Sequence, residues 1–449
     1  MPTYNTKSDD DSESDNNSES NNDDAESMKS NTDDSESNND DSESSDYADE
    51  DLGNEYYGMI LDNRYIILHK IGSGGFASVW LSYYINDPKK IYYYAIKIQN
   101  SEYYEEGKIE VNTFLKISKI KSEYLMNMIE YFKVKSLDTK KYSICMVFEL
   151  MACSLYQLIR RGKYNKGLPP EVVYNISLQI IAGIKDIHEK LKMIHTDIKP
   201  ENILIKGYEK NIKCIINEID KYNLSNMYKE ILDNEKNNYS LSLKKRKNIK
   251  KLKQNVNNKM KDKVIIIMDE INKNYESGKE VEKELEDDIN NIKIVISDFG
   301  SIIDLNDYDK KTEIQTRYYR APEIVLKCGF DEKCDIWSLG CTIYEILTGD
   351  ILFDPEKDNE HSRDFHHVYW FYEICGNIPK WMIEKSDKKK EFFDKNGKFL
   401  VKKPEFWDIK QVIKEEKQID IIDDDKLDQV INMIYSMLKI NPNERTINN

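Results

Sequence analysis

The sequence predicts an α+β fold of two lobes, a small β-rich lobe followed by a larger helical one. Short β-rich runs fill residues 57–150, whereas apolar residues in 151–449 recur mostly at the helical spacing of three and four. A long spacer of low complexity, residues 207–291, interrupts the second lobe, and an acidic tail, residues 1–56, precedes the first. We expect these divisions to be the domain boundaries.

The acidic tail holds nearly all of the charge imbalance. Residues 1–52 contain 19 Asp and Glu and two Lys, which leaves 63 of the 82 acids and 64 of the 66 bases for the rest. Its repeated Asp-Ser-Glu-Ser phrases lack core-forming side chains, so we expect a disordered, solubilising segment. A sharper interpretation is a substrate for acid-directed Ser kinases, or an arm that captures Arg-rich partners. The nearly neutral remainder gives no reason to expect direct nucleic-acid or membrane binding.

Cysteine usage and composition bear on compartment and source. The seven cysteines form no Cys-x-x-Cys pair, which is typical of reduced thiols inside a cell, in the cytoplasm, the nucleus or both. Apolar runs such as Val264–Met268 are far too short to span a bilayer. Abundant Tyr, Ile, Asn and Lys beside scarce Ala, Gly and Pro indicate an AT-rich coding genome, such as that of a large DNA virus or a protist.

Four strands and a helix are expected in the small lobe. The strands are the β-rich runs Tyr65–Lys70, Val79–Tyr84, Tyr92–Ile98 and Ser143–Glu149. The helix lies near Glu110–Lys116, where apolar residues follow at helical spacing.

Helices dominate the second lobe. Their periodic segments are Ser154–Arg160, Glu171–Leu191, Lys333–Leu347, Arg363–Cys375 and Leu427–Leu438. The 95 residues between Asn202 and Asp298 form a far longer connection than is usual between neighbouring elements. Within it, residues 244–263 are basic, and residues 269–290 are mostly acidic and expected to be partly helical.

A glycine-rich turn joins the first two expected strands. Its glycines let the backbone approach the phosphates of ATP, Phe76 can cover its tip, and Val79 can pack on adenine. A plain hairpin is the alternative, whereas a dinucleotide site is disfavoured because a strand follows and not a helix. The nucleotide-binding residues that we expect here are Ile71, Gly72, Ser73, Gly74, Gly75, Phe76, Ala77, Ser78 and Val79.

Lys97 lies on an apolar strand, where a lysine is costly unless it is paired. We expect it to contact the α- and β-phosphates and to pair with a carboxylate of the nearby helix. Glu110 is favoured because apolar residues follow it at core spacing, with Glu105 and Glu106 as alternatives.

The run Ile-Cys-Met-Val-Phe-Glu-Leu-Met at 144–151 indicates a buried strand that leads into a hinge. Backbone groups at Glu149 and Met151 would then face adenine. An ordinary core strand explains most of these residues equally well.

The run His-Thr-Asp-Ile-Lys-Pro-Glu-Asn at 195–202 is the strongest chemical signal. Asp197 can accept the proton of an attacking hydroxyl, and Lys199 can neutralise the phosphate that moves. Asn202 and Asp298, the latter opening an Asp-Phe-Gly after an apolar run, can hold Mg²⁺. The spacing and order indicate phosphoryl transfer from Mg-ATP.

Several polar residues are expected to hold the site in place. Glu323 should pair with Arg445. Asp335 should bind the backbone of the catalytic loop at 195–202. Thr316 together with Lys199 favours Ser or Thr over Tyr as the acceptor. The residues with expected structural roles are Thr316, Arg320, Glu323, Asp335 and Arg445.

These motifs resemble the eukaryotic protein kinases of the CMGC group, most closely the SR-protein kinases. The resemblance rests on Thr196, on the runs at 74–82 and 144–149, and on the segment at 348–355. A long spacer after the catalytic loop is also similar to that family. The resemblance implies a bilobal protein kinase fold from about residue 57 onwards, ATP and Mg²⁺ as cofactors, and Ser in Arg-Ser repeats as the acceptor.

The same resemblance implies an acidic docking groove and a constitutively active enzyme. Asp350, Asp364 and Glu373 match acids of that groove, whereas His366 replaces another acid, which would weaken docking or make it pH-sensitive. Thr196 replaces an Arg that binds an activation-loop phosphate in most kinases, so no such phosphate is expected to be needed.

We therefore predict a monomeric Ser/Thr protein kinase that acts on Arg/Ser-rich proteins. One alternative is a CMGC kinase with other substrates, of the dual-specificity or Cdc2-like type. The other is a nucleotide-binding scaffold, against which the presence of all four transfer residues argues: Lys97, Asp197, Asn202 and Asp298.

Overall fold

The computed structural model describes most of the chain from residue 54 onwards. The described ranges are 54–85, 92–135, 141–160, 164–207, 210–238, 246–276, 289–306, 308–402, 405–417 and 425–447. The acidic tail predicted over 1–56 therefore lies outside the described residues up to position 53, and the spacer prediction does so at 208–209, 239–245 and 277–288.

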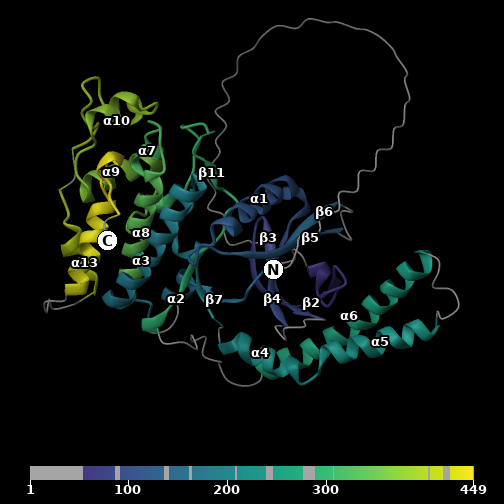
Figure 1. Cartoon of the computed structure of the whole chain (residues 1–449). Coiled ribbons are helices and arrows are strands. Elements are labelled where there is room, and N and C mark those ends of the chain that lie inside the picture. Colours follow the sequence, from purple (N-terminus) through teal and green to yellow (C-terminus); the bar gives the residue numbers. More distant parts are fainter. Residues whose placement is uncertain are drawn as a thin grey trace, which may run out of the picture. The chain divides into compact units, whose positions relative to one another are not determined.

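The small lobe is a six-stranded antiparallel sheet with the helix α1 (Tyr104–Ile120) packed on it (Figure 1). The strand order is β1-β2-β3-β4-β6-β5. The strands are β1 (Ile60–Leu61), β2 (Tyr65–Gly74), β3 (Ala77–Tyr84), β4 (Tyr93–Gln99), β5 (Met128–Lys135) and β6 (Tyr142–Phe148). The four predicted strands are confirmed, and two further strands are present. β1 is only two residues long, and the edge strand β5 exposes Ile129 and Tyr131 and so lacks a buried apolar run.

The two faces of this sheet have separate apolar cores. Ile96 and Ile98 of β4 belong to one core, together with Trp80, whereas Ala95 belongs to the other core, which α1 shares. Because side chains alternate along a strand, Lys97 points to the Ala95 side. That side faces α1 and the second lobe.

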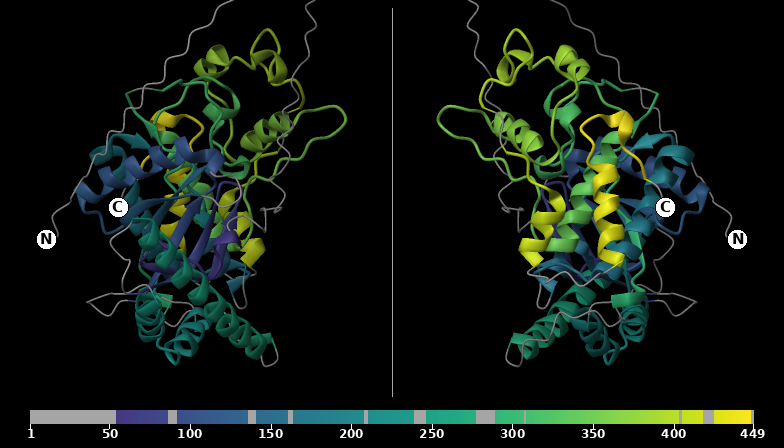
Figure 2. Two further views of the ribbon diagram at one scale, coloured as in Figure 1. Left: turned by 90° about the vertical axis from the view of Figure 1, so that its right-hand side faces the viewer. Right: turned by 90° about the vertical axis from the view of Figure 1, so that its left-hand side faces the viewer.

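The second lobe is helical, and α3, α8 and α13 pack side by side in it (Figures 1 and 2). Its helices are α2 (Leu155–Ile159), α3 (Pro170–Lys185), α7 (Pro322–Val325), α8 (Lys333–Thr348), α9 (Arg363–Ile374), α10 (Lys380–Lys385), α11 (Lys389–Phe392), α12 (Ile409–Lys417) and α13 (Asp425–Met437). The five predicted helical segments are confirmed, with bounds that differ by a few residues. An α+β fold of two lobes, β-rich and then helical, is therefore the observed architecture.

Short strands in the second lobe flank the residues that the sequence predicts to be catalytic. The sheet β10-β9-β7 comprises β7 (Met151–Ser154), β9 (Ile203–Lys206) and β10 (Ile294–Ile296), and β8 (Met193–Ile194) pairs with β11 (Ile303–Asp304). The run at 195–202 therefore connects β8 to β9, and Asp298 follows the end of β10.

The described part of the spacer contains three helices, whereas the sequence predicts low complexity with helix only near 269–290. They are α4 (Lys210–Asp220), α5 (Leu224–Asn238) and α6 (Arg246–Glu276), of which α5 and α6 lie side by side (Figure 1). In α6 the buried apolar residues recur every three or four positions: Leu252, Val256, Met260, Val264, Ile267, Met268 and Ile271. The sequence alone does not reveal this stripe, because Asn and Lys occupy many of the positions between the apolar residues.

The spacer helices contact the small lobe through specific hydrogen bonds. Tyr93 Oη of β4 donates to Asp220 Oδ1 at 2.6 Å. Ser225 Oγ of α5 donates to the carbonyl oxygen of Ile85 at 2.7 Å and lies 2.9 Å from Tyr83 Oη.

Among the described residues, no helix is long and apolar enough to cross a membrane.

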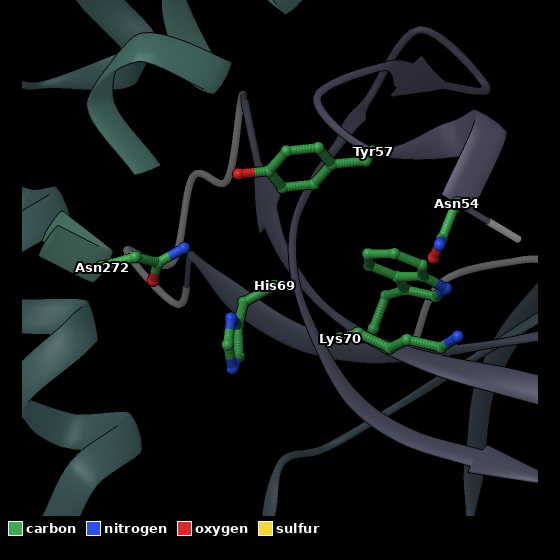
Figure 3. A pocket seen from close by; sticks show the side chains of 6 residues that line it. Asn54, Tyr57, His69, Lys70 and Asn272 are labelled. Atoms are coloured by element: carbon green, nitrogen blue, oxygen red, sulfur yellow. The ribbon is translucent and has the colours of Figure 1, made fainter. Parts of the chain in front are cut away.

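A pocket of about 320 Å³ lies where α6 meets β2 and β3. Tyr57, His69 and Asn272 surround it (Figure 3), and Trp80 also lines it. Since Trp80 belongs to the core on the face opposite Lys97, this pocket is separate from the predicted nucleotide site.

Candidate active site

The catalytic loop at 195–202 is held by a buried carboxylate at the start of α8. Asp335 accepts backbone N–H groups from His195 at 2.8 Å and from Thr196 at 2.9 Å, and its Oδ2 lies 2.8 Å from His188 Nε2. Thr196 has a φ of 70°, a conformation that β-branched residues rarely adopt. Asp335 therefore fixes a strained backbone immediately before Asp197.

Asp197 is surrounded by three polar side chains. Its Oδ2 lies 2.9 Å from Lys199 Nζ and accepts a hydrogen bond of 2.9 Å from Asn202 Nδ2, and its Oδ1 accepts one of 2.7 Å from Thr316 Oγ1. Lys199 Nζ also donates to Thr316 Oγ1 at 2.8 Å. Burial alone would raise the pKa of Asp197, but Lys199 and Thr316 outweigh it and lower that pKa. Asp197 is therefore ionised at neutral pH and can accept a proton.

Lys97 lies between two carboxylates. Its Nζ is 2.7 Å from Glu110 Oε1 and 3.5 Å from Asp298 Oδ1. Burial lowers the pKa of Lys97, but the two carboxylates outweigh it and raise that pKa, so the ammonium is retained. Glu105 instead pairs with Lys108 on the surface of α1. Glu110, on the buried face of α1, thus joins that helix to the strand that carries Lys97.

Phe299 connects α1 with the catalytic loop. Its ring is buried and lies 5.4 Å from the ring of Phe114 on α1 and 5.4 Å from that of His195. His195 Nε2 lies 3.0 Å from the carbonyl oxygen of Ser297, and Ser297 Oγ donates to the carbonyl oxygen of Asn202 at 3.0 Å. The position of Asp298 is therefore fixed relative to Asp197 by contacts on both sides.

The residues around Asp298 and Asn202 suit a hard divalent cation. Asp298 is half-exposed, and Asn202 donates to Asp197 through Nδ2, so its amide oxygen points the other way. Carboxylate and amide oxygens are the ligands that Mg²⁺ prefers. These two residues could hold the ion next to Lys97.

The glycine-rich turn is the hairpin between β2 and β3. Val79 pairs with Lys97 across the strands, which places the two residues beside each other. Gly74 and Gly75 have open space where a side chain would lie, and Phe76 at the tip is 61% exposed and contacts the Tyr103 ring. The loop is thus open on the side where the phosphates of a nucleotide would lie.

The hinge is the short link between β6 and β7. β6 ends at Phe148 and β7 begins at Met151, so the exposed Glu149 and the buried Leu150 make the connection between lobes. Met151 pairs with Lys206 of β9, whose strand leads from the catalytic loop. The hinge and the catalytic loop therefore share one small sheet.

Comparison with known proteins agrees with this geometry. The family model for the protein kinase domain matches residues 65–216 and 284–447, with the gap at the spacer. The chain belongs to the protein kinase family. Members of this family use ATP and Mg²⁺ in general.

Three similar relatives indicate the type of kinase. The chain is 31% identical to the serine/threonine-protein kinase L205 of Acanthamoeba polyphaga mimivirus, over 77% of this chain and 78% of the relative. It is 28% identical to the serine/threonine-protein kinase SRPK of Physarum polycephalum, over 89% of both chains. Protein kinase dsk1 of Schizosaccharomyces pombe is 24% identical, over 88% of this chain and 80% of the relative. This protein is a Ser/Thr kinase of the CMGC group and is SRPK-like.

The activation segment, which runs from Asp298 to Glu323, is stabilised by ion pairs within the chain. Arg320 pairs with Glu313 and donates to the carbonyl oxygen of Gln315, and Gln315 Nε2 donates to the carbonyl oxygen of Cys334 at 2.9 Å. Glu323 and Arg445 form a fully buried pair at 2.5 Å. The predicted structural residues thus lie between the end of the segment and the helical core.

The three acids expected to dock substrate lie in different environments. Asp350 is exposed, and Glu373 is half-buried on α9, with burial raising its pKa. Asp364 is largely buried and pairs with Arg317 of the activation segment and with Lys388. It therefore joins the segment to α9, and in this conformation its charge is already neutralised within the chain.

Three contacts at the site were not anticipated. Thr196 Oγ1 donates to the carbonyl oxygen of Ser301 at 2.9 Å. Arg317 directly follows Thr316, which the sequence singles out, whereas Lys388 stands in a lysine-rich stretch with no distinguishing pattern. Their pairing with Asp364 depends on the fold alone.

Proposed function

We propose that this kinase transfers the γ-phosphate of ATP to Ser side chains of Arg/Ser-rich proteins, as a constitutively active monomer. The observation that carries the proposal is the assembled site, in which Asp197, Lys199 and Thr316 contact one another while Lys97 pairs with Glu110. Phosphate transfer needs a correctly placed Asp197 and the Lys97–Glu110 pair at the same time. The SRPK of Physarum polycephalum, at 28% identity, supports the substrate class.

The chemistry follows from the roles of the side chains. The Ser oxygen attacks the γ-phosphorus while the bond to the β–γ bridging oxygen breaks, and the Ser proton passes to Asp197. Lys199 offsets charge on the phosphate being moved, and Lys97 holds the phosphates that remain with ADP. Mg²⁺, when held by Asn202 and Asp298, supplies neutralisation of the phosphate charge.

Constitutive activity is supported by the activation segment itself. Arg317 and Arg320 are paired with Asp364 and Glu313, and Thr196 bonds to Ser301. In many kinases a phosphate supplies such ordering through a cluster of arginines. Among the described residues, such ordering contacts are made by groups of the chain itself.

Exposed or half-buried acids support an Arg-rich substrate. Asp350 and Glu373 form no ion pair with another described residue, and carboxylates bind guanidinium groups with two parallel hydrogen bonds. Asp364 contributes to docking only if arginines of the substrate displace Arg317 or Lys388. We therefore assign the main docking contribution to Asp350 and Glu373.

The test is phosphate transfer from labelled ATP to three peptides: an Arg-Ser repeat, a Lys-Ser repeat and a Ser-Pro peptide. Selective labelling of the Arg-Ser peptide, weakened in Glu373→Gln, is the expected result. Preference for the Ser-Pro peptide would favour a CMGC kinase with other substrates. Transfer to none of them, with ATP still bound, would favour a scaffold.

We further propose a large DNA virus as the source of the chain. The mimivirus relative at 31% identity supports this, together with the AT-rich coding bias.

The acidic tail at 1–53, which lies outside the described residues, would bind Arg-rich substrates and so raise their local concentration.

A further inference from the structure

A cluster of two histidines and one carboxylate lies outside the kinase site. Asp358 and His361 belong to the connection between α8 and α9, and His366 lies in the first turns of α9. His366 Nε2 is 2.9 Å from Asp358 Oδ2, and His361 Nδ1 is 3.6 Å from Asp358 Oδ1. One ligand atom from each of the three side chains lies within 4.8 Å of the other two.

The backbone around the cluster holds the three side chains in this arrangement. Asp358 Oδ1 accepts N–H groups from Glu360 at 2.8 Å and His361 at 2.7 Å, which turns Oδ2 towards His366. The His361 ring lies 4.2 Å from the ring of the buried Phe365. The side chains are therefore positioned by contacts that do not depend on a ligand.

An ordinary surface ion pair explains only part of this arrangement. The contact between Asp358 and His366 would contribute little stability at an exposed site. It does not account for a second imidazole directed at the same carboxylate. His361, His366 and Asp358 remain 27%, 30% and 50% exposed, so an ion in solution can reach them.

The ligand types decide which ion fits. Imidazole nitrogen suits Zn²⁺ and its transition-metal neighbours, whereas Mg²⁺ and Ca²⁺ prefer oxygen ligands throughout. Ligand bonds of about 2.0–2.2 Å place neighbouring donors of a tetrahedral Zn²⁺ site roughly 3.3 Å apart. The imidazole nitrogens lie 2.9 Å from Asp358 Oδ2 and 3.6 Å from Asp358 Oδ1, and one ligand atom of each side chain lies within 4.8 Å of the others, so small side-chain rotations bring the three donors to Zn²⁺ distance.

We propose that Asp358, His361 and His366 bind a Zn²⁺ ion, with water in the remaining position. This site is distinct from the Mg²⁺ site at Asn202 and Asp298. The bound Zn²⁺ links the connection before α9 to the start of that helix. Asp364, which pairs with Arg317 of the activation segment, lies in the same turn.

The test is Zn²⁺ affinity of the metal-stripped full chain, measured by competition with a chromophoric chelator in excess Mg²⁺. We expect one Zn²⁺ per chain and a loss of affinity of about 100-fold or more in His361→Gln and in His366→Gln, since even outer contacts of a metal site contribute 10–100-fold. Glu356→Gln, an exposed acid in the same connection, is the matched control and should bind as the parent does.

Thermal unfolding gives a second readout that does not depend on catalysis. Zn²⁺ should raise the Tm of the parent and of Glu356→Gln, but not that of His366→Gln. If a histidine variant fails to fold without metal, Asp358→Asn replaces it. Unchanged affinity in the histidine variants, or loss only in Asp298→Asn, would overturn the proposal.

Discussion

Thr196 Oγ1 donates a hydrogen bond of 2.9 Å to the carbonyl oxygen of Ser301. This bond joins the catalytic loop to the segment that follows Asp298. Asp335 fixes the same threonine through its backbone N–H. Thr196 therefore connects the catalytic loop directly to the start of the activation segment.

Phosphatase treatment should leave the kinase active. Because Arg317 and Arg320 are already paired with Asp364 and Glu313, removal of phosphate takes away no contact on which the segment depends. The measurement is the initial rate of peptide phosphorylation before and after treatment, with dephosphorylation verified by mass spectrometry. A rate that collapses after treatment, and returns on rephosphorylation, would show that a phosphate orders the segment.

Glu110→Gln should lower the rate of phosphate transfer on the order of 100-fold, because Lys97 loses the buried carboxylate that orients it towards the phosphates. Glu105→Gln, on the exposed side of the same helix, is the control and should keep the parental rate. Steady-state kinetics with varied ATP measure both. Equal effects from the two variants would mean that the pair has no special role.

Met260→Ala should destabilise the spacer helices by about 2–5 kcal/mol, because it removes a fully buried side chain from the stripe of α6. Ile266→Ala on the same helix is the control, since Ile266 is 65% exposed. Urea denaturation followed by circular dichroism measures the free energy of unfolding of each variant. If the spacer helices were not packed, neither substitution would change the free energy of unfolding.

Glu345 should make stability depend on pH. Burial raises the pKa of this carboxyl from 4.5 to about 7, although the hydroxyl of Tyr319 opposes the shift. The folded protein therefore holds the proton more tightly than the unfolded chain. The resulting stabilisation is complete below about pH 4.5 and is lost as the pH rises through about 7.

Glu345→Gln should flatten this part of the stability profile, since an amide does not titrate. Glu384→Gln, at an exposed position of α10, should leave the profile unchanged. Denaturant unfolding at several pH values between 4 and 8 (roughly the window in which the group titrates) measures both. A parental profile that stays flat would exclude a raised pKa at Glu345.

The sequence predicts most accurately where chemistry imposes a fixed spacing. Asp197, Lys199 and Asn202 act on one phosphate and therefore lie within one short loop. The β-rich and helical lobes also follow from periodicity, because each element buries one face. The structure adds that Glu110, and not Glu105, pairs with Lys97. This pairing depends on the orientation of α1.

Contacts between distant segments could not be predicted from the sequence. The pairing of Asp364 with Arg317 and Lys388 joins three separate parts of the chain, and none of them carries a local pattern for it. The stripe of α6 is present in the sequence but is diluted by Asn and Lys. Strand β5 is recognised only once β6 lies beside it.

The most direct measurement of the central claim is the single-turnover rate of phosphate transfer to an Arg-Ser peptide by the parent and by Asp197→Asn. The account predicts a loss of about 10²–10⁴-fold, the range for a group that accepts the substrate proton, with ATP affinity retained. Asp309→Asn, an exposed Asp in the activation segment, is the matched control. Transfer by Asp197→Asn at the parental rate would contradict the assignment of Asp197 as the proton acceptor.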